Sequence, residues 1–118
     1  MRVGIDLVEV ARIADLAARR GQRGLERLFT AAELAYALSA RPPLRYQRLA
    51  ARFAAKEAFR KAMGRPIAFR DLEVRKAGSV PYLAWGEQTC SLSLTHTRDL
   101  AGAMVILPQV APPPRKAP

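Results

Sequence analysis

Hydrophobic and polar residues follow different patterns in the two halves of the chain. Residues 2–8 are rich in Val, Ile and Leu, which is typical of a short buried strand. The Ala- and Arg-rich run over residues 10–20 predicts a helix, and Gly21 and Gly24 interrupt it. The chain is therefore expected to begin with a strand that leads directly into a helix.

Two further helices carry start and stop signals. Thr30 and Glu33 form a capping box, which predicts a helix to about Ala40 that the following prolines end. Residues 44–63 predict a long helix that stops at Gly64 and Pro66. A wide face of this long helix consists of small residues, which allow close packing against a neighbour: Ala50, Ala51, Ala54, Ala55, Ala58 and Ala62.

The second half of the chain is dominated by strand signals. Residues 71–76, 82–85 and 90–95 predict strands, and residues 101–107 predict a fully buried strand whose period alone also allows a helix. Helices followed by strands predict an α+β fold with helices packed on a small antiparallel sheet. We expect one domain over residues 1–107 and a Pro-rich disordered tail over residues 108–118.

The charge of the chain is strongly positive and unevenly placed. The net charge is +10; residues 1–65 hold 14 basic and 6 acidic side chains, whereas residues 66–118 hold 6 and 4. Such a field attracts nucleic acid, anionic lipid, phosphorylated small molecules or an acidic protein, and it is equally compatible with a solvated basic surface. A chain of 118 residues also gains burial from self-association.

Several classes of site and location are excluded by composition. Cys90 and His96 are the only residues of their types, so the chain has no internal disulfide and no ligand set for zinc. Any metal must be a hard cation bound by carboxylates. No apolar run approaches the length of a membrane span and the N-terminus has no cleavage site, so we expect a cytoplasmic protein that does not enter a membrane.

Two acidic residues stand out from their surroundings. Glu57 is the only acid between Pro42 and Pro66, a segment that carries seven Arg and Lys residues. Asp6 lies within an apolar strand, where Asp is normally depleted. Each has an ordinary explanation, because Glu57 can pair with Lys61 on a helix surface and Asp6 can lie on the exposed face of an edge strand or cap a helix. If the two converge, their oxygens suit Mg²⁺ and the surrounding cations suit phosphates, which predicts phosphoryl chemistry.

Two other features are less specific. Arg12, Arg19 and Arg23 fall on one stripe if the first helix persists past Gly21, and such a stripe suits the carboxylates of an acidic partner or forms a solvated face. His96 follows a strand directly, and a lone His there is more often structural than catalytic. No Gly-rich phosphate loop is present.

Four segments resemble the bacterial holo-acyl-carrier-protein synthases, a family of 4′-phosphopantetheinyl transferases. They are GIDLVEVARI (4–13), RFAAKEAFRKAMG (52–64), FRDLEVRK (69–76) and SLTHTRDLAGAMVIL (93–107), in the order of that family. The resemblance implies an α+β transferase fold, a homotrimer with active sites at the subunit interfaces, and a place in fatty acid biosynthesis. It also implies Mg²⁺ as cofactor, coenzyme A as donor and an acidic apo-acyl carrier protein as acceptor.

The resemblance also assigns roles to individual residues. Asp6 and Glu57 match the metal ligands, and Lys61 matches a lysine that contacts the phosphates. The coenzyme A contacts map to Arg52, Lys61, Gly64, Ser93, Thr95 and His96. The carrier-protein contacts map to Arg12, with Arg19 and Arg23 by similar placement. The loop after Gly64 is shorter than the pattern of the family.

The implied reaction transfers 4′-phosphopantetheine from coenzyme A to a carrier serine and releases 3′,5′-ADP. The base that accepts the serine proton stays open between a water molecule and Asp6. Two rival functions are a basic nucleic-acid-binding module and a catalytically silent carrier-binding protein. The first leaves Asp6 and Glu57 unexplained and offers few aromatic residues for stacking bases.

Overall fold

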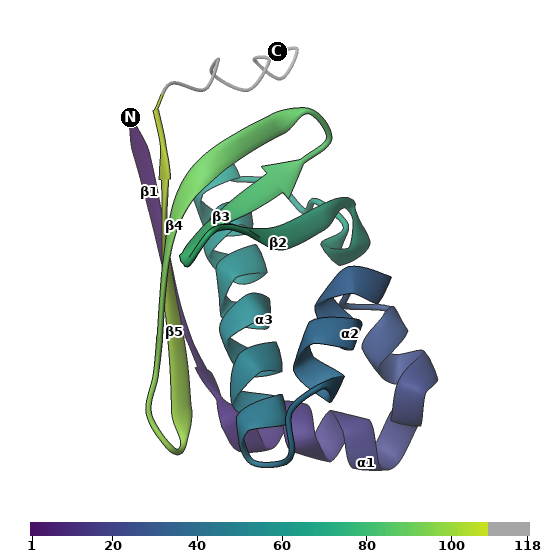
Figure 1. Ribbon diagram of the computed structural model, residues 1–118. Coiled ribbons are helices and arrows are strands. Elements are labelled where there is room, and N and C mark those ends of the chain that lie inside the picture. The colour runs from purple at the N-terminus through teal and green to yellow at the C-terminus, as the bar shows by residue number, and fades with distance from the viewer. Residues whose placement is uncertain (109–118) are drawn as a thin grey trace.

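The protein folds around one five-stranded antiparallel sheet, whose strands differ in length. The computed structural model describes residues 1–108, and within them the strands pair in the order β1-β5-β4-β3-β2. The strands are β1 (Arg2–Glu9), β2 (Leu72–Ala77), β3 (Val80–Trp85), β4 (Gln88–His96) and β5 (Leu100–Leu107). Strand β1 is therefore an edge strand, and it pairs with the last strand of the chain with Ile5 opposite Met104 (Figure 1).

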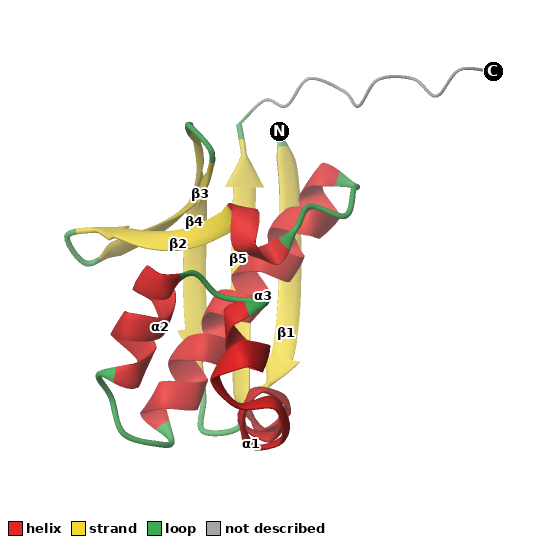
Figure 2. Cartoon of the chain, turned by 90° about the vertical axis from the view of Figure 1, so that its right-hand side faces the viewer, coloured by secondary structure: helices red, strands yellow, loops and turns green. Residues whose placement is uncertain are grey.

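Three helices gather on one side of the β1–β5 part of the sheet (Figures 1 and 2). They are α1 (Val10–Glu26), α2 (Ala31–Leu38) and α3 (Leu44–Met63), and a short 3₁₀ helix, η1 (Phe69–Asp71), precedes β2. The long helix α3 packs along β1 and β5 and forms the centre of the core. This arrangement confirms the predicted α+β fold with helices on an antiparallel sheet.

Small residues set the distance between α3 and β1. All six alanines of the predicted alanine face are buried. Gly4 of β1 faces the same helix so closely that a methyl group on its α-carbon would collide with the backbone carbonyl of Ala58. This close approach brings the middle of β1 next to the C-terminal half of α3.

The helix boundaries confirm most of the sequence signals. The Thr30–Glu33 capping box is formed in both directions, and Gly64 ends α3 in the left-handed conformation with φ 71°, which suits glycine. Helix α2 ends at Leu38, two residues before the predicted end. Helix α1 continues past the predicted end at residue 20, but Gly21 has non-helical dihedral angles and kinks it.

The C-terminal part of the core is a strand. Residues 101–107 belong to β5, which pairs with β1 on one side and β4 on the other, so the helical alternative for this run is wrong. Of the predicted Pro-rich tail only Pro108 lies within the described residues. Among residues 1–108 no helix is both long and apolar enough to cross a membrane.

Candidate functional site

The structure pairs Asp6 with Lys61. Lys61 Nζ on α3 donates hydrogen bonds to Asp6 Oδ1 at 2.8 Å and to the Ile5 carbonyl at 3.1 Å, both on β1. The Asp6 side chain is 15% exposed and that of Lys61 is 58% exposed, so the pair lies at the surface of the free edge of the sheet. The hydrogen bond that Lys61 donates to Asp6 raises the pKa of Lys61, which keeps this side chain an ammonium ion at neutral pH.

Glu57 approaches the same lysine from one helical turn away. Its side chain is 30% exposed, and Arg60 Nη1 donates to Glu57 Oε1 at 3.2 Å. The Glu57 charge also contributes to the raised pKa of Lys61, as a smaller effect than that of Asp6. Of the two acids that stand out in the sequence, Asp6 on β1 is therefore hydrogen-bonded to Lys61, and Glu57 stands one helical turn before Lys61 on α3. We call these three residues the Asp6–Glu57–Lys61 cluster.

A groove of about 370 Å³ extends from Glu57 along helix α1. Arg12 and Arg19 line it together with an apolar set, which consists of Ile13, Leu16, Leu28, Phe53 and Phe69. The Arg12 guanidinium lies 5.3 Å from the centre of the Phe53 ring. Arg23 is not part of the lining, because the kink at Gly21 separates it from the first half of α1. The predicted single stripe of three arginines therefore ends at Arg19.

A second pocket, of about 320 Å³, lies on another side of α3. Arg52 and His96, two positions that the resemblance assigns to coenzyme A, line it together with Arg48, Lys76 and Tyr36. The sequence interpretation assigned no role to Lys76 or Tyr36. Arg52 is only 5% exposed and burial lowers its pKa, yet its Nε has no hydrogen-bond partner among the described residues. The lining residues within residues 1–108 include no Asp or Glu. We call this the Arg52 pocket.

The segment Ser93–Thr95–His96 is divided between the two faces of the sheet. His96 lines the Arg52 pocket, whereas Ser93 and Thr95 are exposed on the opposite face, which carries no helix. A methyl group on the α-carbon of Gly102 would meet the Thr95 methyl carbon at 3.4 Å and the Leu7 side chain at 3.6 Å, so Thr95 lies on the same face of the sheet as Leu7. The alternation of side chains along a strand makes this division unavoidable. Within one chain these three residues do not form a single surface.

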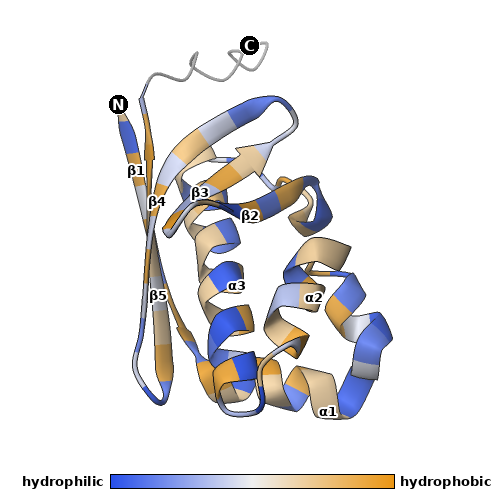
Figure 3. Cartoon of the chain, in the orientation of Figure 1, coloured by the Kyte–Doolittle hydropathy of each residue, from blue (hydrophilic) through white to orange (hydrophobic). Residues whose placement is uncertain are grey.

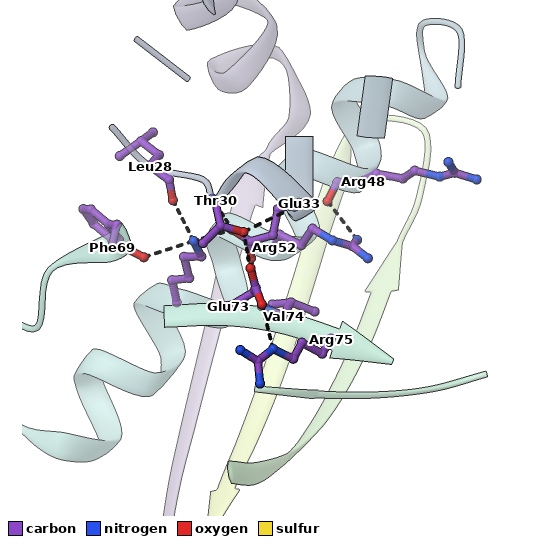
Figure 4. Close-up of polar contacts among 10 residues, drawn as sticks. Leu28, Thr30, Glu33, Arg48, Arg52, Phe69, Glu73, Val74 and Arg75 are labelled. Carbon is purple, nitrogen blue, oxygen red and sulfur yellow. Dashed lines mark hydrogen bonds and ion pairs between the residues drawn. The ribbon is translucent and has the colours of Figure 1, made fainter. Parts of the chain in front are cut away.

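Lys56 is fully buried and does not belong to any exposed basic surface. Its partners Leu28, Glu33 and Phe69 are labelled in Figure 4. Its Nζ donates to Glu33 Oε1 at 2.6 Å and to the carbonyls of Leu28 at 2.7 Å and Phe69 at 3.0 Å. Glu33 in turn accepts from the backbone N–H groups of Thr30 and Val74. Burial lowers the pKa of Lys56 and the attraction of Glu33 opposes that shift.

This network fixes two walls of the groove beside Glu57, because Leu28 and Phe69 both line that groove. The sequence interpretation counted Lys56 among the phosphate-binding cations. A signal was present, since Lys56 stands in a row of helix positions three or four residues apart whose other members are large: Leu49, Arg52, Phe59 and Met63. All of that row is buried.

Comparison with known proteins decides the family. Residues 2–105 match the family model of the 4′-phosphopantetheinyl transferase superfamily. The holo-[acyl-carrier-protein] synthase of Deinococcus radiodurans is 47% identical over 123 aligned residues, which cover 89% of this chain and 90% of that protein. The chain belongs to the holo-[acyl-carrier-protein] synthase family. It is therefore a member of a transferase family, which confirms the resemblance carried by the four sequence segments.

Solved structures of this family agree with the fold. The holo-(acyl-carrier-protein) synthase of Bacillus anthracis, in complex with coenzyme A (3′,5′-ADP), superposes with a TM-score of 0.78 at 33% identity, covering 88% of this chain and 92% of that one. The Helicobacter pylori holo-[acyl-carrier-protein] synthase, in complex with coenzyme A, has the same TM-score at 27% identity and covers 88% and 97%. These two solved structures therefore share the overall fold described above.

Proposed function

We propose that this protein transfers 4′-phosphopantetheine from coenzyme A to a serine of an apo-acyl carrier protein. The observation that carries the proposal is the Asp6–Glu57–Lys61 cluster, because it places two carboxylates and one ammonium ion together on a chain of the synthase family. The relatives named as holo-[acyl-carrier-protein] synthases and the coenzyme A complexes of two family members support the same donor and acceptor.

Asp6 and Glu57 fit a Mg²⁺ ion. Both offer carboxylate oxygens, both are partly exposed, and the described residues contain no larger cluster of His, Cys, Asp or Glu. Mg²⁺ is commonly held by one or two carboxylates and completes its coordination with water and substrate phosphates. When bound, the ion supplies charge neutralisation to the pyrophosphate. Lys61 is held as an ammonium ion beside the same acids and donates to phosphate oxygens.

The Arg52 pocket is proposed to bind the phosphorylated ribose end of coenzyme A. Its cations have no acid to balance them within the lining, and the buried Nε of Arg52 lacks a partner. A phosphate monoester supplies both the missing charge and the missing acceptor. His96 lines the same pocket and adds a hydrogen-bonding ring. The contacts of Gly64, Ser93 and Thr95 with coenzyme A remain predictions from the resemblance.

The proposed transfer step uses these residues as follows. The carrier serine Oγ attacks the phosphorus that bears pantetheine, a new O–P bond forms, and the bond from that phosphorus to the bridging oxygen breaks. The electron pair leaves on 3′,5′-ADP, whose charge Lys61 and nearby arginines stabilise. The serine proton passes to a base, for which Asp6 and a water molecule are the candidates.

The groove beside Glu57 is proposed to receive the acidic carrier protein. Arg12 and Arg19 provide positive charge at its rim, and the apolar lining provides buried contact area next to the reacting cluster. Arg23 lies beyond the kink of α1, so its contact with the carrier remains a prediction that the groove does not support directly. Charge at a rim accelerates association more than it strengthens the final complex.

A homotrimer with interfacial sites accounts for two features of the single chain. Each residue of an α-helix is rotated by about 100° from the one before it, so Lys61 lies about 180° around the axis of α3 from Arg52. Lys61 and Arg52 of the same chain therefore face in opposite directions, and one coenzyme A molecule is not expected to contact both. The sheet face without helices exposes Val3 by 56%, Ile5 by 67% and Leu7 by 66%. Figure 3 colours the chain by hydropathy and shows hydrophobic stretches along β1. Contiguous apolar residues at a surface are typical of an interface, and we propose that further copies of this chain cover them.

The deciding experiment incubates the protein with apo-carrier protein, coenzyme A and Mg²⁺, and follows the intact mass of the carrier. We expect a gain of one phosphopantetheine per carrier, abolished by a chelator. No mass gain with an active control synthase would refute transfer. Carrier binding without mass gain would support a silent carrier-binding protein, and tight salt-dependent binding of random duplex would support the nucleic-acid-binding alternative.

A matched variant tests the proposed metal ligand. Glu57→Gln keeps the shape of the side chain and removes its charge, so we expect turnover to fall most strongly when Mg²⁺ is limiting. Normal turnover of this variant under limiting Mg²⁺ would show that Glu57 is not a ligand.

Sedimentation velocity of the wild type and of Ile5→Lys tests the trimer. Cytoplasmic localisation, a role in fatty acid biosynthesis and the absence of a nucleic-acid partner remain predictions.

A further inference from the structure

Tyr36 lies against three cations in the Arg52 pocket. The centre of its ring is 4.2 Å from the guanidinium carbon of Arg48, 4.4 Å from that of Arg52 and 4.6 Å from Lys76 Nζ. Lys76 Nζ also donates a hydrogen bond to the Tyr36 hydroxyl at 2.9 Å. The three cations come from α3 and β2, whereas Tyr36 comes from α2, so a single side chain joins three elements at this pocket.

This arrangement requires a compensating interaction. Three like charges around one pocket repel one another, and the described lining offers no carboxylate to offset them. The electron-rich face of an aromatic ring attracts cations, and the attraction is stronger where the cation is shielded from water, as Arg52 is. The hydrogen bond from Lys76 lowers the pKa of Tyr36, and the charges of Lys76, Arg48 and Arg52 act in the same direction.

We propose that Tyr36 is a positioning residue for coenzyme A, whose ring and hydroxyl hold Arg48, Arg52 and Lys76 together as one receptor for the terminal phosphate monoester. The inference rests on the proposed function, since it assigns that ligand to the Arg52 pocket. Tyr36 itself supplies none of the positive charge that attracts the phosphate. It holds in place the three side chains that supply this charge, Arg48, Arg52 and Lys76.

The physical reason is preorganisation. Arg and Lys side chains are long and flexible, and ordering them upon binding weakens affinity. A guanidinium group stacked on a ring keeps its N–H donors at its edge, where they remain free to meet phosphate oxygens. Arg52 already donates one N–H to the Arg48 carbonyl at 3.3 Å, whereas its Nε remains unused among the described residues.

The location of Tyr36 predicts an effect on binding more than on turnover. Tyr36 lines the Arg52 pocket and none of its ring contacts belongs to the Asp6–Glu57–Lys61 cluster. Loss of the ring should therefore raise the KM for coenzyme A and leave kcat at saturating coenzyme A nearly unchanged. The KM for a donor that lacks the 3′-phosphate should depend much less on the Tyr36 ring, because such a donor has no phosphate for the three cations to bind.

Three variants of the full chain test the proposal. Tyr36→Leu removes the ring, Tyr36→Phe removes only the hydroxyl, and Tyr46→Phe is the matched control for loss of a hydroxyl elsewhere. Calorimetry with adenosine 3′,5′-bisphosphate measures the affinity of the pocket for this ligand in the absence of the transfer reaction. We expect about tenfold weaker binding for Tyr36→Leu, about two- to threefold for Tyr36→Phe and no change for Tyr46→Phe, from the usual strength of cation–π and hydrogen-bond contacts.

Kinetics with two donors separate positioning from a general loss of structure. For Tyr36→Leu we expect the KM for coenzyme A to rise about tenfold, that for dephospho-coenzyme A to rise less than about threefold, and kcat to stay within about twofold. An equal rise for both donors would overturn the proposal. So would unchanged bisphosphate affinity of Tyr36→Leu. If wild type does not bind the bisphosphate, the assignment of the pocket falls and the inference falls with it.

A double-mutant cycle decides the case even if Tyr36→Leu does not fold. The hydroxyl of Tyr36 is proposed to act through Lys76, so Tyr36→Phe should have no further effect on bisphosphate affinity in a Lys76→Met background. Additive losses from the two substitutions would contradict that coupling. Thermal melting of each variant, expected within a few degrees of wild type, confirms that the comparison is made between folded proteins.

Discussion

Lys56→Met should destabilise the fold far more than the loss of an exposed lysine. Methionine keeps the apolar stem and removes the ammonium group. Glu33, which is fully buried, would lose the partner 2.6 Å away, and the carbonyls of Leu28 and Phe69 would lose their donor. Breaking a buried ion pair by removing one member typically costs about 3 to 5 kcal/mol. That is a large part of the roughly 5 to 15 kcal/mol that stabilises a domain.

Urea unfolding followed by circular dichroism measures this loss of unfolding free energy. The urea concentration at the midpoint should fall, while the dependence of the free energy on urea concentration stays unchanged. The control is Lys61→Met on the same helix, whose side chain is 58% exposed and whose ion pair should contribute at most about 1 kcal/mol. In a cycle with Glu33→Gln, the double variant should be less destabilised than the sum by about 2 to 3 kcal/mol. Equal midpoints for Lys56→Met and Lys61→Met would refute the reasoning.

Three further substitutions or measurements test other parts of the structure. Gly4→Ala should cost about 1 to 3 kcal/mol or more in urea unfolding, because its methyl group would overlap the backbone of α3; Gly102→Ala, whose methyl group meets the Thr95 methyl carbon at 3.4 Å, is the control and should cost less. Cys90, whose pKa burial raises to about 11, should react with iodoacetamide near neutral pH only after unfolding, and rapid labelling of the native protein would contradict its burial. Hydrogen bonds from Thr30 and Arg75 lower the pKa of Glu73 from its ordinary 4.5, so its contribution to stability is present above that pH and is lost as the pH falls through the lowered value. The stability difference between wild type and Glu73→Gln should accordingly shrink below about pH 4.5, and a difference constant down to pH 2 would disprove the assignment.

Local signals in the sequence were sufficient for the elements of secondary structure. The capping box at Thr30, the stop at Gly64 and the alternation along residues 90–95 each act within a few residues of the chain, so sequence spacing determines them. The kink of α1 at Gly21 follows from the same local chemistry, although its consequence for the arginine stripe depended on whether the helix continued.

The sequence also singled out Asp6 and Glu57, because each is an acid where its surroundings predict none. The sequence alone leaves open whether these two acids converge, whereas in the structure Lys61 is hydrogen-bonded to Asp6 one helical turn after Glu57. This contact depends on the close packing of β1 against α3, which Gly4 and the alanine face allow but do not by themselves specify. The long-range pairing of β1 with β5 supplies the rest.

Only the tertiary structure distinguished the cations of α3 from one another. Lys56 and Lys61 are five residues apart and chemically identical, yet one is fully buried against Glu33 and the other is 58% exposed beside Asp6. Helical periodicity gives the angle between two side chains but not which side another element covers. The sequence by itself therefore determined the helices, the strands and the two unusual acids. Packing between distant segments decided which charges are structural, which line a pocket, and which remain at the surface.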